Sequence, residues 1–113
     1  MGVEVYQSKA RVVQATGDID LSNVGELNAA LNDAVKESPD GFIIDLSEVT
    51  YIDSAGIAAI ISAYQRICSH NGKLALVVKT ANVKDILDLI HLNMLPGLFI
   101  CDDLPCAESK LSA

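Results

Sequence analysis

The chain has 113 residues, which is enough for one domain with a hydrophobic core and too few for two. Half of the residues are hydrophobic, with only two Phe and no Trp, so we expect an aliphatic core of the kind that suits an α/β protein. The formal net charge of −7 argues against a direct nucleic-acid binder, because phosphate binding needs clustered Lys and Arg.

The pattern of apolar residues and cysteines bounds the location and redox state of the chain. No stretch approaches the roughly 18 uncharged apolar residues of a membrane span, and residues 2–9 lack a signal-peptide core. We therefore expect a cytoplasmic protein without membrane insertion. Cys68, Cys101 and Cys106 lack the spacing of metal ligands, so we expect reduced structural thiols and no metal site.

The first elements in chain order are two short β-type runs, residues 3–7 and 11–16, which are close enough to pair as a hairpin. Residues 17–20, Gly-Asp-Ile-Asp, break the pattern. Ser22 or Asn23 can then cap a helix. The apolar positions of that helix are Val24, Leu27, Leu31, Ala34 and Val35.

A buried strand and a second helix follow, with a polar connection between them. After a turn at residues 38–41, the run Phe-Ile-Ile-Asp at 42–45 predicts a strand that ends at Asp45. From Ser54 onward the apolar spacing becomes helical, and Ser54 is placed to cap this helix with its hydroxyl group. The residues expected to face the core are Ile57, Ile60, Ile61, Tyr64, Ile67 and Cys68.

Small uncharged residues lie on the opposite side of the second helix: Ala55, Ala58, Ala59 and Ser62. A helix face that meets only water usually carries Glu and Lys, whereas no charge occurs in the first two turns here. We expect a shallow surface that another protein can approach closely. The alternative is that the C-terminal part of the chain covers this face.

The remaining elements alternate between strand and helix. Residues 74–78 predict a strand, and Thr80 is placed to cap a third helix. Residues 98–101 predict a short strand, and Asp103 is placed to cap a final short helix. The apolar side of the third helix consists of Val83, Ile86, Leu87 and Ile90. The order β-β-α-β-α-β-α-β-α predicts a single α/β domain with helices packed on a mostly parallel mixed sheet and an N-terminal antiparallel hairpin.

Ligand sites in such sheets gather at the carboxyl ends of the strands, where we expect Asp20 and the connection of residues 45–54. A serine hydrolase fits this region poorly. A nucleophile elbow needs Gly two residues before Ser54, where Ile52 stands, and only His70 or His91 is available as a base.

A phosphate-accepting receiver domain fits poorly as well. Asp45 ends a predicted strand, but the acidic pair Asp18 and Asp20 follows a hairpin instead of a first parallel strand. The glycines are isolated, so no phosphate-binding loop is present. What remains is Ser54 between Asp53 and a small-residue helix face, an arrangement that suits a serine phosphorylated by another protein.

Two segments resemble the STAS-domain family, and within it the free-standing bacterial anti-sigma factor antagonists. They are residues 17–20 and residues 45–57, Asp-Leu-Ser-Glu-Val-Thr-Tyr-Ile-Asp-Ser-Ala-Gly-Ile, and the similarity extends over nearly the whole chain. The resemblance implies that an anti-sigma factor with Ser/Thr kinase activity phosphorylates Ser54. Asp53, Asp20 and Gly56 are then neighbours of the phosphorylation site.

The same resemblance implies partner switching without catalysis or a cofactor in this chain. The unphosphorylated protein binds the anti-sigma factor and releases sigma, and a PP2C-type phosphatase reverses the modification. The expected partner-binding residues are Ala55, Ile57, Ala58, Ala59 and Ser62. Relatives often have Ser or Thr where Ala55 stands and Gly where Ala58 stands. The alternative is a non-enzymatic STAS subunit of a lipid-transport or stress-signalling complex.

Overall fold

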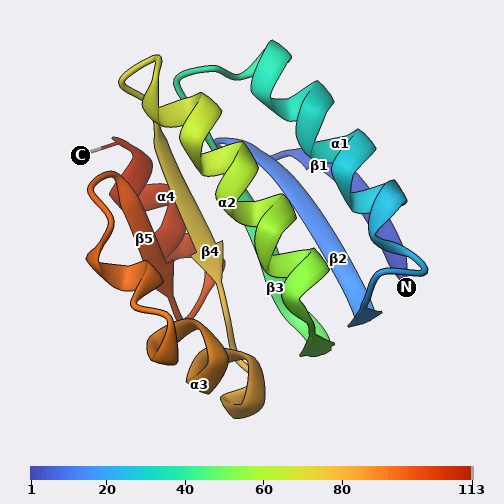
Figure 1. Ribbon diagram of the computed structural model, residues 1–113. Helices are drawn as coiled ribbons and strands as arrows, with labels where there is room; N and C mark the ends of the chain where they lie inside the picture. Colours follow the sequence, from blue (N-terminus) through green and yellow to red (C-terminus); the bar gives the residue numbers. More distant parts are fainter. Residues whose placement is uncertain (113) are drawn as a thin grey trace.

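A five-stranded sheet in the order β1-β2-β3-β4-β5 forms the centre of the computed structural model, which describes residues 1–112 (Figure 1). β1 pairs antiparallel with β2, and all other neighbours pair in parallel. The elements are β1 (Gly2–Gln7), β2 (Arg11–Ile19), α1 (Val24–Glu37), β3 (Gly41–Ile52), α2 (Ser54–Cys68), β4 (Lys73–Val77), α3 (Ala81–Leu89), the 3₁₀ helix η1 (Leu92–Met94), β5 (Leu98–Cys101) and α4 (Leu104–Ser112). The predicted fold class and element order are confirmed, with η1 as the addition.

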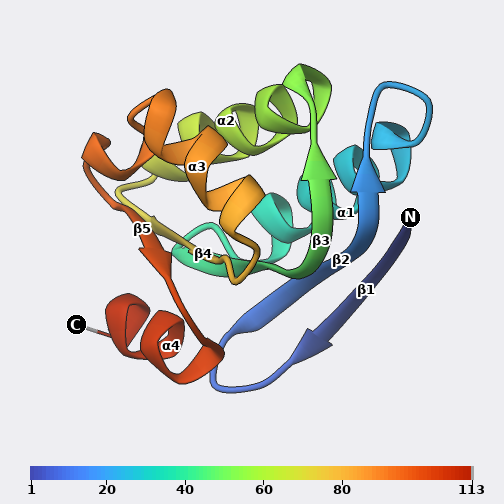
Figure 2. The same cartoon turned by 90° about the horizontal axis from the view of Figure 1, so that it is seen from below.

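The sheet is covered on both faces, as Figure 2 shows: α1, α2 and α3 lie on one side and α4 on the other. A large aliphatic core fills the space under the first three helices. A smaller core, which includes Val12, Ile43, Ala75 and Ala107, lies under α4. Ile43 and Ile44 therefore point to different cores, which explains the continuous apolar run in β3.

β2 and β3 are both longer than the sequence pattern predicts. Asp45 pairs with Val77 at the end of the β3–β4 ladder, but β3 continues to Ile52 alongside β2. Its pairing with β2 is interrupted by register shifts, one of them between Gly17 and Asp18. The prediction that Asp45 ends its strand is wrong. Asp45 lies within β3, is only 7% exposed, and accepts a hydrogen bond from the Ser47 N–H group at 2.9 Å.

The inner face of α2 also differs from the prediction. Ala59 is only 5% exposed and belongs to the large core, whereas Cys68 is exposed. The apolar pattern misplaced these residues because it gives weight to large side chains, while Gly and Ala permit a close approach of this helix to its neighbours. The chain's C-terminal helix does not cover α2, because α4 lies on the opposite side of the sheet (Figure 2).

The helix termini confirm some predicted caps and correct others. Asp103 Oδ1 accepts a hydrogen bond from the Cys106 N–H group at 2.9 Å at the start of α4, as expected. Thr80 precedes α3, but its hydroxyl group donates to the Val49 carbonyl at 2.8 Å instead of capping the helix. Thr80 therefore ties the α3 entrance to β3. Ile90, expected to face the core, is exposed at the end of α3.

No helix within residues 1–112 is both long enough and apolar enough to cross a membrane.

Adjacent alanines of α2 provide a test of the packing. Ala59→Glu places a carboxylate without a partner in the core and should lower the free energy of unfolding by at least about 3 kcal/mol. Ala58→Glu, on the exposed side, should change it by less than about 0.5 kcal/mol. Urea unfolding followed by circular dichroism measures both. Equal stability of the two variants would contradict the burial of Ala59.

Candidate functional site

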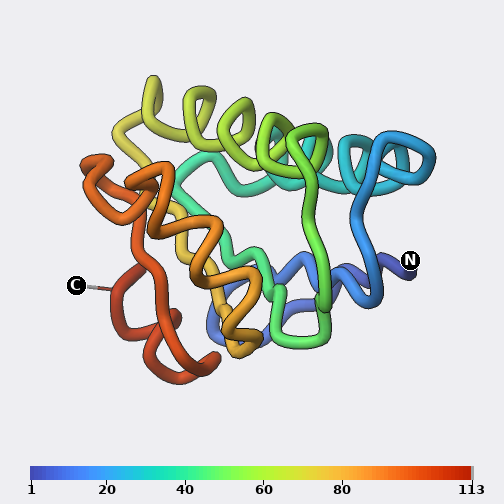
Figure 3. Tube along the Cα trace, turned by 60° about the horizontal axis from the view of Figure 1, so that its bottom comes forward, coloured from blue at the N-terminus to red at the C-terminus, as the bar shows by residue number. Residues whose placement is uncertain are grey.

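The candidate site lies where β2 and β3 end beside each other. Ile19 pairs with Ile52, the last residues of the two strands, and the Asp53 N–H group donates to the Ile19 carbonyl at 3.1 Å. The connection into α1 and the connection into α2 therefore leave the sheet side by side (Figure 3). This hydrogen bond brings the segment around Asp20 next to the start of α2, as the parallel topology predicts.

Asp53, and not Ser54, caps α2. Asp53 has an extended backbone, and its Oδ1 atom accepts hydrogen bonds from the N–H groups of Ala55 at 2.9 Å and Gly56 at 3.3 Å. The prediction that Ser54 caps the helix is wrong, because a cap precedes the first helical residue and Ser54 is that residue. The carboxylate also meets the positive end of the helix dipole.

The Ser54 side chain is left available by this arrangement. Ser54 is exposed, and within residues 1–112 its hydroxyl group makes no hydrogen bond. The backbone that carries it is fixed from both sides, by the Asp53 cap and by the bond from Asp53 to Ile19. The site thus presents an accessible hydroxyl group at a defined position.

Asp20 organises the turn that leads into α1. Its Oδ1 atom accepts hydrogen bonds from the backbone and the hydroxyl group of Ser22, and its carbonyl accepts from the Val24 N–H group at 2.9 Å. The hydroxyl hydrogen bond is the main reason that the pKa of the Asp20 carboxyl lies below its ordinary value. Asp20 is therefore a turn residue. Its expected role in phosphorylation at Ser54 stays a prediction.

Gly56 has a packing role in the first turn of α2. A Cβ atom at this position would lie 2.6 Å from Ile52 Cγ1 and 2.8 Å from Ile19 Cγ2. Glycine therefore lets the helix sit directly on the two strand ends. Gly56 is close to Ser54 in the sequence, as expected for a residue beside the site, but it lies on the buried side of α2.

The exposed side of α2 carries four uncharged residues, Ser54, Ala58, Ser62 and Gln65, which we call the α2 stripe. Their spacings of four, four and three residues place them along one side of the helix. Ala55 and Ile57 are half-buried beside the stripe. Of the residues expected to bind a partner, Ala59 is thus buried, and the other four lie on or beside this surface.

An exposed leucine that the sequence pattern did not reveal lies next to the site. Leu21 follows Asp20 in the turn before α1 and is 78% exposed. A large apolar residue between Asp20 and Ser22 was the available signal, because turns of this kind usually contain polar residues. The turn is tied to the end of β2, because Asn23 Nδ2 donates to the Asp18 carbonyl at 2.9 Å, and Asp18 is in turn held to β3 by the Thr50 hydroxyl group, which donates to Asp18 Oδ1 at 2.6 Å.

The geometry gives no support to the two other interpretations of this region. His70 follows the far end of α2, and a helix of 15 residues separates its ends by about 22 Å. Asp45 lies within β3, on the ladder to β4, and not at the strand ends where Asp18 and Asp20 lie. Residues 1–112 contain no group of three or more His, Cys, Asp or Glu side chains arranged to hold a metal ion.

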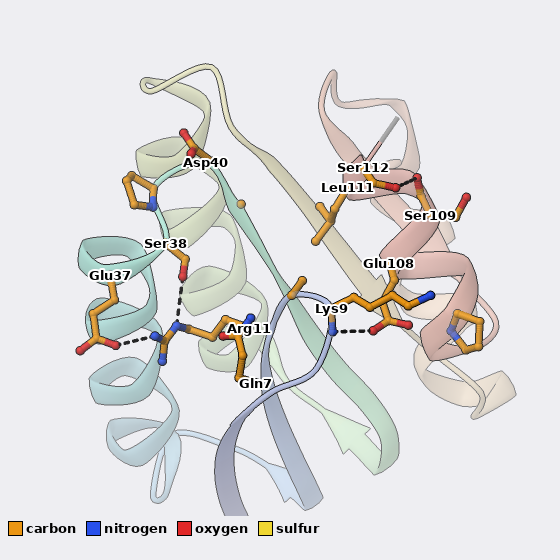
Figure 4. Close-up of a pocket in the computed structure, with 14 residues that line it drawn as sticks. Gln7, Lys9, Arg11, Glu37, Ser38, Asp40, Glu108, Ser109, Leu111 and Ser112 are labelled. Carbon is orange, nitrogen blue, oxygen red and sulfur yellow. Dashed lines mark hydrogen bonds and ion pairs between the residues drawn. The ribbon is translucent and has the colours of Figure 1, made fainter.

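A polar pocket of about 680 Å³ lies at the opposite end of the sheet, near the starts of β2 and β3 (Figure 4). The hairpin turn, the α1–β3 connection and α4 form its walls. Arg11 is paired with Glu37 at 2.9 Å and donates to Ser38 at 3.0 Å, while Glu108 accepts from the Lys9 N–H group at 3.1 Å. The charged groups that line this pocket thus serve largely to join α1, α4 and the hairpin.

Comparison with known proteins identifies the class of domain. The STAS domain profile matches residues 3–103, so the chain belongs to the STAS domain family. An anti-sigma factor antagonist from Mycobacterium paratuberculosis is similar in structure, with a TM-score of 0.87 and 23% identity over 99% of this chain and 94% of that chain.

Two further solved structures share the fold at lower identity. An anti-sigma-factor antagonist (STAS) domain protein from Planctomyces limnophilus has a TM-score of 0.81 and 16% identity, covering 98% of both chains. The phosphorylated form of the Bacillus cell fate determinant SpoIIAA has a TM-score of 0.72 and 13% identity, covering 96% of this chain and 98% of that chain.

Substitutions at Asp53 test the cap. Asp53→Ala removes the acceptor for two N–H groups and should lower the free energy of unfolding by about 1 kcal/mol. Asp53→Asn keeps an acceptor oxygen and should lose less than half of that amount. Thermal and urea unfolding measure both variants. If the Asn variant loses as much as the Ala variant, the charge and not the hydrogen bond is the main contribution.

The Asp20 turn can be tested by titration. Because the Ser22 hydroxyl stabilises the ionised carboxylate, Ser22→Ala should raise the pKa of Asp20 toward its ordinary value. This pKa can be measured from the carboxyl ¹³C chemical shift of Asp20 between about pH 2 and about pH 7, a range that brackets the titration of an ordinary Asp. An unchanged pKa would show that the Ser22 hydroxyl does not bond to Asp20 in solution.

Proposed function

We propose that this chain is an anti-sigma factor antagonist whose binding is switched off by phosphorylation of Ser54. The observation that carries the proposal is the exposed Ser54 hydroxyl group on the first residue of α2, fixed by the Asp53 cap and continuous with an uncharged helix surface. Membership in the STAS domain family supports the same reading, as do structural relatives described as anti-sigma factor antagonists.

The unphosphorylated protein docks the α2 stripe and the adjoining Leu21 turn on the anti-sigma factor, which then releases sigma. The stripe has no charge, so burying it against a partner removes no ion from water. Small side chains at Ala58 and Ser62 allow the partner to approach the helix closely. Leu21 supplies exposed apolar area beside this surface.

Phosphorylation changes binding more than folding. A phosphoserine adds about −1.5 to −2 charges, and the start of a helix tolerates negative charge because of its dipole and free N–H groups. Docking requires this dianion to leave water, next to Asp53 and in a chain of net charge −7. A hundredfold loss of affinity needs only about 2.7 kcal/mol, which the desolvation of one phosphate can supply.

The chemistry of the switch belongs to the partners. The anti-sigma factor is a Ser/Thr kinase that brings ATP and Mg²⁺ to Ser54, and a PP2C-type phosphatase returns the chain to its binding form. This chain acts as a substrate and a ligand, and none of its residues is assigned a catalytic role. Asp20, beside the start of α2, contacts the kinase; the alternative that it positions the Ser54 hydroxyl group has no support, because Asp20 Oδ1 accepts from Ser22 instead.

A kinase assay with matched serine variants tests the assigned residue. The purified partner kinase with ATP should label the wild-type chain and Ser62→Ala but should not label Ser54→Ala. Ser62 is the appropriate control because it is an exposed serine on the same helix face. Intact-mass analysis and phosphopeptide mapping provide the readout. Labelling of Ser54→Ala at the wild-type level would show that another residue accepts the phosphate.

A charge on the α2 stripe tests the docking surface. Ala58→Glu should weaken binding to the anti-sigma factor at least about tenfold, since the new carboxylate must be desolvated on docking. Ala29→Glu adds the same charge to an exposed position of α1 and should leave affinity unchanged. Isothermal titration calorimetry measures both affinities.

A pull-down from the source cells tests the alternative function. Recovery of transporter subunits and no anti-sigma factor would favour a lipid-transport complex.

A further inference from the structure

Two of the three cysteines lie next to each other where β5 leads into α4. Cys101 is the last residue of β5, is only 3% exposed, and belongs to the smaller core together with Ala107 of α4. Cys106 is exposed in the first turn of α4. Only residues 102–105 separate the two cysteines, so the connection holds them within a short distance.

The positions of both thiol groups are fixed by their elements. The Asp103 cap accepts the Cys106 N–H group at 2.9 Å and sets the direction of the first turn of α4. Ala107 packs into the core that contains Cys101, which holds α4 against the sheet. Cys106 directly precedes Ala107, so its thiol group lies near that of Cys101, close enough to help raise the pKa of Cys101.

We propose that Cys101 and Cys106 form a dithiol pair that a hydroperoxide oxidises to an intramolecular disulfide. This modification site is independent of the function proposed for Ser54. The proposal is consistent with the earlier prediction of reduced thiols, because both cysteines are free in the structure and form a disulfide only when an oxidant is present.

The reaction has two balanced steps. The exposed Cys106 sulfur attacks the peroxide oxygen, the O–O bond breaks, and Cys106 becomes a sulfenic acid while the rest of the peroxide leaves as water or an alcohol. The Cys101 sulfur then attacks the Cys106 sulfur, the S–O bond breaks, and water leaves. Two thiol hydrogens are lost in total, and the peroxide is the species that is reduced.

The surroundings of Cys101 set the order of these steps. Burial is the main cause that raises the pKa of the Cys101 thiol to about 12; the Cys106 thiol and Asp102 contribute to this shift, and Lys110 opposes it. Since the thiolate is the reactive form, Cys101 is a poor first target for peroxide. Its attack on the Cys106 sulfenic acid also needs the thiolate, but in this step the closeness of the two sulfurs compensates for the small thiolate fraction, so Cys101 acts as the resolving thiol.

Tryptic peptide mass mapping of the full chain tests the proposal, because trypsin leaves the two cysteines in one peptide and Cys68 in another. Cys101 and Cys106 fall in one peptide, residues 85–110, whereas Cys68 falls in residues 67–73. After treatment with hydrogen peroxide, digestion without reductant should give a peptide 85–110 that lacks two hydrogens. Dithiothreitol should restore its mass. Cys68→Ser serves as the control and should show the same change, because Cys68 lies in α2.

Two alanine variants separate the pair from other thiol chemistry. Cys106→Ala and Cys101→Ala should both abolish the loss of two hydrogens, and Cys101→Ala should retain a sulfenic acid on Cys106 that dimedone traps. Cys106→Ala is expected to keep full stability because Cys106 is exposed, whereas Cys101 is buried. Oxidation of Cys106 to a sulfinic acid in the wild type, with Cys101 still a free thiol, would overturn the proposal. So would a disulfide between Cys68 and either other cysteine.

Discussion

The parallel pairing of β2 and β3 up to Ile19 and Ile52 is the constraint on which the site depends. The pairing ends with the hydrogen bond from the Asp53 N–H group to the Ile19 carbonyl, which joins the exits of both strands. Gly56 lets α2 rest on the same two isoleucines. Without this junction the Asp20 turn and the first turn of α2 would have no fixed relation, and Ser54 would be an ordinary surface serine.

The junction separates structural work from the chemistry proposed for Ser54. Asp53 accepts from two of the N–H groups at the start of α2, those of Ala55 and Gly56, so the Ser54 hydroxyl group is not needed as the cap of the helix. Asp20 holds its own turn through Ser22. A modification at Ser54 can therefore alter the charge of the surface while leaving the hydrogen bonds of the fold unchanged. This separation suits a protein that must be stable in two states of phosphorylation.

The sequence predicted the fold because alternating strands and helices leave few topologies, and the apolar run at residues 42–45 marked the buried strand. It could not predict that β3 continues to Ile52, since residues 46–52 are partly polar and owe their extended form to pairing with β2. Ala59 was misplaced because an alanine fits either side of a helix and only the packing decides. The role of Ser54 as the phosphorylation site stays a prediction, whereas the cap was assigned one residue late, because Asp and Ser are both good caps.

The central claim is that phosphate on Ser54 prevents docking without disturbing the fold. The most direct measurement is calorimetric titration of the anti-sigma factor with one preparation of this chain, first fully phosphorylated and then treated with phosphatase, with an NMR spectrum of each form. We expect at least about a hundredfold weaker binding for the phosphorylated form and chemical-shift changes confined to the start of α2 and the Asp20 turn. Equal affinities, or loss of binding that accompanies general unfolding, would contradict it.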